Sequence, residues 1–133
     1  MNSILKVGDK ASLSKKFTDD DVRQYAHLSL DTNPVHLDAS YAAESVFGKK
    51  IVHGMLAAGL FSAVLGTILP GEGSIYLGQT LNFKLPIYIG EEITASVEVI
   101  KIRTDKPIVT LRTICLNSEG SVVIEVEAVV KAP

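Results

Sequence analysis

The fold is decided by one uncharged stretch, His53-Gly-Met-Leu-Ala-Ala-Gly-Leu-Phe-Ser-Ala-Val-Leu-Gly-Thr-Ile-Leu69, which ends at Pro70-Gly71. Pro-Gly is a strong stop signal, so we predict a helix over 53–69. A helix from Met55 to Leu69 is about 22 Å long at 1.5 Å per residue, whereas the hydrocarbon core of a bilayer is roughly 30 Å thick. A membrane span is therefore disfavoured. Because the helix carries no charge on any face, we expect it to be buried all round inside a soluble fold.

Small residues recur every four positions along this helix, at Gly54, Ala58, Ser62 and Gly66. Residues with this spacing share one helix face. A stripe without bulky side chains lets another backbone, or a ligand, approach closely.

The sequence after residue 72 has the pattern of consecutive strands. Alternation is clearest from Ile93, through Ala95 and Val97, to Val99, which share one face. Short turns between consecutive strands indicate an antiparallel sheet. We expect this sheet to wrap around the apolar helix, and its open edge favours pairing with a second copy of the chain. The predicted strands are 75–83, 85–89, 93–103, 108–116 and 122–131.

The segment before the apolar helix is predicted to hold an edge strand at 11–17 and two short helices. Thr18 is a good N-cap for the first helix, and Asp38 caps the second, over 39–46. Pro34 prevents the first helix from continuing through residues 31–34. With 133 residues and no linker or repeat, we expect a single domain over residues 1–133.

Composition excludes several classes of protein. The 13 basic and 15 acidic residues give no basic footprint for nucleic acid. Cys115 is the single cysteine, which argues against a disulfide or a zinc site and fits a reducing compartment. No secretory leader pattern is visible in Met1 to Lys6, so we expect a cytoplasmic protein that binds neither nucleic acid nor membrane.

The first candidate site is Asp31-Thr-Asn-Pro-Val-His36. Pro34 excludes a helix through this segment, but a turn at Asn33-Pro34 brings both side chains to one point. A carboxylate beside an imidazole is suited to moving a proton to or from water near neutral pH. The structural alternative is that Asp31 caps a turn and His36 lies on the surface.

The second candidate site is Ile51-Val-His-Gly-Met55, at the start of the apolar helix. The first amide groups of a helix have no intrahelical partner and carry the positive end of its dipole. The Gly54 amide is therefore suited to a carbonyl oxygen that gains charge. Alternatively, Gly54 only permits close packing. For the ring of His53 we favour a structural role over a part in the site.

Four segments resemble the MaoC-like, (R)-specific enoyl-CoA hydratases, and most closely the short bacterial enzymes that feed polyhydroxyalkanoate synthesis. They are Tyr25-Ala-x-Leu-Ser-x-Asp31-x-Asn-Pro-Val-His36, Ile51-Val-His-Gly-Met-Leu56, Gly73-Ser-Ile-Tyr-Leu-Gly-Gln79 and Phe83-Lys-Leu-Pro86. The resemblance covers nearly the whole chain, and its Asp-x-Asn-Pro-x-His segment is highly specific. One departure is Leu30, where many members have glycine.

The resemblance implies an α+β hot-dog fold, an antiparallel sheet around a long central helix, assembled as a homodimer. It also implies reversible hydration of trans-2-enoyl-CoA to (R)-3-hydroxyacyl-CoA, with the CoA thioester as substrate and no cofactor or metal. Asp31 is then the base, and His36 positions the water and donates a proton. The Gly54 amide binds the thioester oxygen, and Asn33 and Ser62 are polar groups of the substrate site. Candidates for contacts with the CoA phosphates are the local basic residues Lys49, Lys50, Lys84, Arg103 and Lys106.

The acyl pocket is expected to be bordered by Leu65, one turn after Ser62, with Val130 as its opposite wall. Both are branched apolar residues, which suits short acyl chains of about four to six carbons. The wall of a pocket discriminates between acyl lengths by only a few kcal/mol per one or two methylenes.

Two other function classes stay open. One is a (3R)-hydroxyacyl-[acyl-carrier-protein] dehydratase, which a basic patch near the site would favour because carrier proteins are acidic. The other is a non-catalytic thioester-binding module or a hot-dog thioesterase. The intact Asp31 and His36 pair argues against a silent module, and the helix from Met55 to Leu69 lacks the carboxylate that a thioesterase needs.

Overall fold

The structure is a computed structural model that describes residues 4–133. Met1 to Ser3 lie outside the described residues. They include part of the segment, Met1 to Lys6, in which the sequence shows no secretory leader pattern. Within residues 4–133, no helix combines the length and the apolar character needed to cross a membrane.

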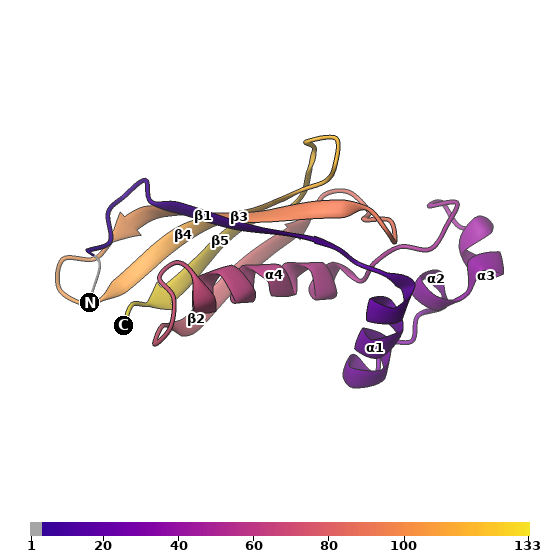
Figure 1. The fold of residues 1–133 in the computed structure, drawn as a ribbon, viewed down its shortest axis with the longest axis horizontal. Coiled ribbons are helices and arrows are strands. Elements are labelled where there is room, and N and C mark those ends of the chain that lie inside the picture. Colours follow the sequence, from indigo (N-terminus) through magenta and orange to yellow (C-terminus); the bar gives the residue numbers. More distant parts are fainter. Residues whose placement is uncertain (1–3) are drawn as a thin grey trace.

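Five antiparallel strands form one sheet, and the long helix α4 (Gly54–Thr67) runs along one of its faces (Figure 1). The strand order is β1-β3-β4-β5-β2, so β2 pairs with β5 although β3 follows it in the chain. This arrangement confirms the predicted sheet around a central helix. The strands are β1 (Lys10–Lys16), β2 (Ile75–Phe83), β3 (Glu92–Ile102), β4 (Ile108–Leu116) and β5 (Val122–Lys131).

Alternation of side chains fixes the inner face of the sheet. In β3 the four predicted inward residues, from Ile93 to Val99, are all buried, and the residues between them are partly exposed. Leu111 and Ile124 extend the same layer across β4 and β5. A one-residue shift of register would turn all of these side chains to the outside, so burial of this face specifies the pairing of the strands.

Helix α4 buries only one of its faces in the single chain. Ala57, Phe61, Val64 and Leu65 pack into the core, whereas the face of Met55, Gly59, Ser62 and Gly66 is exposed. The expectation of burial all round is therefore wrong for one copy of the chain. An apolar sequence pattern cannot tell a face covered by the same chain from a face left open.

The short helices α1 (Asp19–Ser29), α2 (Pro34–Leu37) and α3 (Ala39–Ala43) project beyond the end of the sheet that is remote from both termini (Figure 1). Thr18 caps α1 as predicted. Its hydroxyl accepts from the Asp21 amide at 3.1 Å, and its own amide donates to the Asp21 carboxylate at 2.9 Å. Asp38 caps α3 through the Tyr41 amide.

Two local predictions are wrong, and one short element was not predicted. The helix predicted for 39–46 ends at Ala43, and the one-turn helix α2 was not predicted, because four residues are too few to show periodicity. The segment 85–89 is not a strand of the sheet. Pro86 has no amide hydrogen to donate, and the chain turns away to pair with the segment before α4, where the Val52 amide donates to the Ile87 carbonyl at 2.7 Å.

Cys115 is fully buried in β4. Burial raises the pKa of the Cys115 thiol to about 12, so little thiolate forms at neutral pH. A buried thiol that stays protonated is a poor nucleophile.

Candidate functional site

The loop between α1 and α2 carries Asp31. Leu30 ends α1 in the left-handed conformation, with φ of 66°. Glycine adopts this conformation without strain, which explains why glycine suits this position in the family that the chain resembles. After Leu30, the Asp31 amide donates to the Ser29 hydroxyl at 3.1 Å. The left-handed residue therefore turns the chain sharply out of α1 and starts the loop that leads to α2.

Asp31 and Asn33 form two successive turns stabilised by their own side chains. The Asp31 carboxylate accepts from the Asn33 amide at 3.2 Å, and the Asn33 side-chain oxygen accepts from the Val35 amide at 3.2 Å. Asn33 is thereby the N-cap of α2, and Pro34 occupies the first helical position, where no amide donor is needed. The short helix then carries His36 back toward Asp31. The predicted turn is confirmed, and it continues into one turn of helix.

His36 is buried and has a fixed orientation. Its Nδ1 lies 2.8 Å from the carbonyl oxygen of Ile51. A carbonyl only accepts, so Nδ1–H is the donor, and Nε2 is the nitrogen left for a ligand. In the neutral ring, Nε2 carries a lone pair, and it carries a proton only in the imidazolium.

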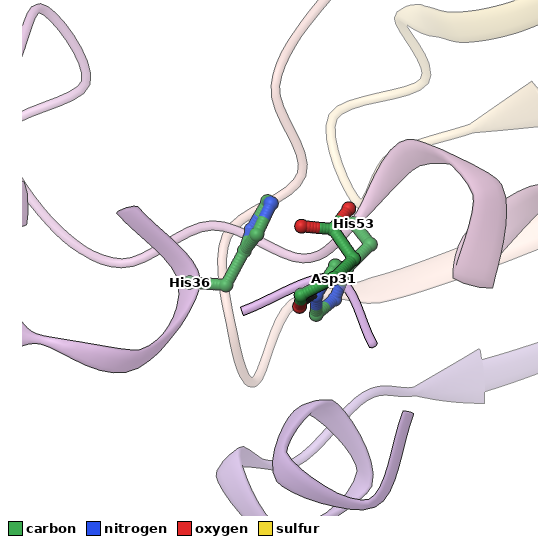
Figure 2. A group of neighbouring side chains, drawn as sticks. All are labelled: Asp31, His36 and His53. Carbon is green, nitrogen blue, oxygen red and sulfur yellow. Dashed lines mark hydrogen bonds between the residues drawn. The ribbon is translucent and has the colours of Figure 1, made fainter. Parts of the chain in front are cut away.

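His53 lies against both members of this pair (Figure 2). Its Nε2–H donates to the main-chain carbonyl of Asp31 at 3.0 Å, and its ring stacks on the ring of His36 with centroids 3.8 Å apart and planes 26° apart. Desolvation by burial is the main cause that lowers the pKa of His53. The ring is therefore neutral at physiological pH.

A carboxylate oxygen of Asp31 and one nitrogen from each of His36 and His53 all lie within 4.8 Å of one another. Such a group has the composition of a metal site. The lone pairs of an imidazole lie in the plane of its ring, however, and two nearly parallel stacked rings do not aim them at a common point. Because Zn²⁺ needs ligand nitrogens at about 2.0–2.1 Å, the stacking disfavours an ion shared by both histidines.

Gly54 is the first residue of α4, and its amide is uncommitted. The N-cap residue His53 makes no side-chain cap, and none of the hydrogen bonds of the described residues uses the Gly54 amide. The absence of a side chain also matters here. A Cβ atom at this position would lie 2.6 Å from the ring of Phe83. Both predicted roles of Gly54, a free amide and close packing, are therefore compatible with the structure.

One cavity of about 450 Å³ brings Asp31, His36 and Gly54 together. Tyr25, His53 and Phe83 also line it, and so does Lys84. Sequence reasoning left Tyr25 and Phe83 unassigned, favoured a structural role for the ring of His53, and gave Lys84 only as a candidate contact of the CoA phosphates. All four lie within the segments that carry the family resemblance, but nothing in their spacing indicates that they share a cavity. Asn33 is not among the lining residues and acts as the cap of α2.

Ser62, Leu65 and Val130 meet in a second, smaller cavity of about 140 Å³, which Ser74 and Tyr76 also line. Ser62 is eight residues after Gly54, which is about 12 Å along the helix axis. Within one chain, the structure thus groups the predicted site residues in two places. The reacting groups lie at the start of α4, and the predicted acyl-pocket residues lie toward its other end.

Replacing Gly54 with alanine is expected to lower the free energy of unfolding by about 1–3 kcal/mol, because the added methyl group overpacks against the Phe83 ring. Chemical denaturation of Gly54→Ala, Phe83→Leu and the double variant measures this. Since leucine removes the ring atoms that the methyl group meets, the double variant should lose less stability than the sum of the two single variants. Additive losses, or a fully stable Gly54→Ala, would contradict the contact.

Comparison with known proteins agrees with this geometry. The family model of the MaoC like domain matches residues 5–117. An (R)-specific enoyl-CoA hydratase from Aeromonas caviae is 55% identical and covers 97% of this chain and 96% of its own. The solved structure of an (R)-hydratase from A. caviae involved in PHA biosynthesis superposes with a TM-score of 0.96, over 97% of this chain and 98% of that one.

A more distant relative is a mitochondrial 3-hydroxyacyl-[acyl-carrier-protein] dehydratase of Solanum lycopersicum, which is 42% identical over 99% of this chain and 80% of its own. The family match extends over most of the chain and includes every residue from Asp31 to Gly54 that lines the larger cavity. The chain belongs to the MaoC-like domain family.

Proposed function

We propose that the chain is an (R)-specific enoyl-CoA hydratase, which adds water to trans-2-enoyl-CoA to form (R)-3-hydroxyacyl-CoA and catalyses the reverse dehydration. The observation that carries this proposal is that Asp31, His36 and Gly54, whose amide is uncommitted, line one cavity. The 55% identity to an (R)-specific enoyl-CoA hydratase supports it. The reaction transfers only the elements of water, so it requires no cofactor.

The spacing of the Asp31 carboxylate and the imidazole suits one bound water. The atoms concerned lie within 4.8 Å of one another. A water that makes two hydrogen bonds of about 2.8 Å bridges groups at this separation. The bridging water has its proton directed to the carboxylate, and its oxygen is free to attack C3 of the enoyl thioester.

The amide of Gly54 is proposed to bind the thioester oxygen. Negative charge grows on this oxygen as water adds at C3, and the helix dipole and the free N–H both favour that charge. Loss of one such donor typically costs about 3 kcal/mol of transition-state stabilisation.

Proton transfer follows from the orientation of His36. Asp31 takes a proton from the attacking water, and C2 receives a proton on the same face. Because Nδ1–H is held by the Ile51 carbonyl, Nε2 is the atom of His36 that donates. His36 therefore acts as the donor in its imidazolium form. After each turnover, the proton on Asp31 passes to His36 and restores the pair.

Asp31→Asn and His36→Gln are each expected to lower kcat for hydration of crotonyl-CoA by about 10²–10⁴-fold, because each removes one partner in proton transfer. Loss of absorbance of the enoyl thioester measures the rate, and chiral chromatography identifies the product. His27→Gln, at an exposed position on α1, is the matched control and should leave the rate unchanged.

Three results would contradict this assignment. They are near-normal rates in a folded Asp31→Asn variant, an (S)-product from the wild type, and release of free CoA in place of hydration. The last result would identify a thioesterase.

Acyl carrier protein is the alternative carrier of the substrate, and the carrier-protein dehydratase of S. lycopersicum keeps this candidate open. Of the five basic residues considered for the CoA phosphates, Lys84 lines the larger cavity, and its amine lies 3.4 Å from a carboxylate oxygen of Glu125. Lys50 is paired with Asp19. The turn that holds Arg103 lies at the opposite end of the sheet (Figure 1). One cationic side chain at the cavity favours a small phosphate ester over an acidic protein surface, and a comparison of kcat/KM on the two carriers decides between them.

A homodimer is proposed because one chain leaves two adjacent surfaces open. In β2 the outer edge is unpaired, and Ile75, Tyr76 and Leu77 on this strand are exposed. Beside it, the exposed stripe of α4 consists of Met55 and small residues. A second copy that pairs its β2 edge and places its α4 antiparallel on this stripe would bring the smaller cavity of one chain toward the larger cavity of the other.

The proposed acyl pocket then belongs to the partner chain. A four-carbon acyl chain, with bonds of about 1.5 Å, is less than about 5 Å long. It cannot reach from Gly54 to a wall about 12 Å further along the same helix. The corresponding cavity of the second copy is the better candidate for the wall that limits acyl length.

Leu65→Ala is expected to extend the range of accepted acyl lengths beyond about six carbons, because the smaller side chain opens the pocket wall. The discrimination between acyl lengths should change by up to a few kcal/mol per one or two methylenes. Rates on enoyl-CoA substrates from C4 to C12 measure this. In a mixed dimer of Leu65→Ala with Asp31→Asn chains, the only complete reacting pair lies on the Leu65→Ala chain. A short-chain profile of this dimer supports a pocket in the partner, and an extended profile contradicts it.

Leu77→Lys is expected to convert the dimer to monomer, because a charge on an unpaired strand edge opposes edge-to-edge pairing. Light scattering after size exclusion measures the mass. Val46→Lys is the matched control, since Val46 is 96% exposed and lies outside the proposed interface. A monomeric wild type would contradict the proposed dimer.

A further inference from the structure

We propose that His53 is a positioning residue for the Asp31 and His36 pair, with its N–H holding the main chain of Asp31 and its ring face holding the plane of His36. The inference builds on the proposed hydratase function. It assigns to His53 a role that neither capping nor core packing accounts for.

The first argument is how the loop of Asp31 is held. Hydrogen bonds of residues 31–33 run to near neighbours in sequence, at Ser29, Val35 and His36. Among the hydrogen bonds of the described part of the chain, the one from His53 to the Asp31 carbonyl is the bond that joins this loop to a distant segment. Without it, the carboxylate is fixed only relative to its own loop.

The second argument is how the ring of His36 is held. The hydrogen bond from Nδ1 to the Ile51 carbonyl fixes one atom of the ring but leaves rotation about that bond. The ring of His53 covers one face of the imidazole at 3.8 Å and restricts this rotation. Tyr25 packs edge-on against His53 at 4.7 Å and supports the stack. The direction of Nε2 of His36 therefore depends on His53.

The third argument is charge. His53 is 2% exposed, and its Nδ1 is buried without a hydrogen-bond partner among the described residues. The titratable groups that face it are Asp31, His36 and Tyr25. A second imidazolium stacked on His36 would oppose protonation of His36. A neutral His53 leaves the charge change of the reaction to Asp31 and His36 alone.

Two variants separate the two contacts. His53→Phe keeps a ring against His36 but removes the N–H, and His53→Gln keeps an N–H but removes the ring. Both are expected to lower kcat on crotonyl-CoA by about a hundredfold, the scale of a misplacement of about 1 Å. KM should stay near the wild-type value, because neither variant removes a group that is proposed to bind the substrate.

Phe17→Leu is the control for a loss of buried aromatic packing, since Phe17 is 3% exposed and lies outside the lining of both cavities. It should lose stability but keep kcat. If either His53 variant is folded and has the kcat of Phe17→Leu, the proposal is wrong.

NMR of the histidine nitrogens in the wild-type chain gives a test that does not depend on folding of the variants. The expected state of His53 is the neutral tautomer with the proton on Nε2, coupled across the hydrogen bond to Asp31. A protonated His53, or the tautomer with the proton on Nδ1, would overturn the proposal. If the wild type lacks hydratase activity, the proposed function fails, and the tautomer still tests how His53 is held.

Discussion

Burial of the inner face of α4 against the curved sheet is the constraint on which the rest of the structure depends. The helix has no charged face, and its large side chains Phe61 and Leu65 lie among inward residues of the strands, including Leu111 and Ile124. Full burial of each such side chain contributes about 1.5–3 kcal/mol. A flat sheet covers only a narrow stripe of a helix, so the sheet must curve. This contact fixes the axis of α4, and with it the direction of the free amides at Gly54.

The reacting groups are attached to that axis through the short segment just before it. Lys50 pairs with Asp19 of α1 at 2.5 Å. Ile51 accepts from His36 through its carbonyl and donates to the carbonyl of Val35. The side chain of His53 then holds Asp31. Four contacts, made by Lys50, Ile51 and His53, thus join the projecting helices to the start of α4. The position of the reacting groups relative to α4 therefore depends on this segment, although none of the reacting side chains lies in the core of the sheet.

Most of the fold could be predicted from the sequence, because the signals were local. Alternation in β3, the cap at Thr18 and the stop at Pro70 each act within a few residues. The strand order could not be predicted, since nothing in residues 75–83 indicates pairing with β5 across the whole chain. The grouping of Asp31, His36 and Gly54 followed from the family resemblance, and their spacing alone left a structural alternative open. A structural role was favoured for the ring of His53, and no local signal indicated its contacts with Asp31 and His36, which lie 22 and 17 residues away.

The groups proposed to act on water and the thioester all come from one continuous stretch, residues 31–54, whereas the smaller cavity is lined by Ser62 and Leu65 from later turns of α4 and by Val130 from β5. A mutation that reshapes the smaller cavity therefore leaves the hydrogen bonds of the reacting groups intact. Selection can change the range of accepted substrates by single steps without passing through inactive intermediates. The same separation makes the short stretch a natural unit for transfer between related scaffolds, provided that the recipient offers a helix whose first residue tolerates an aromatic ring at contact distance.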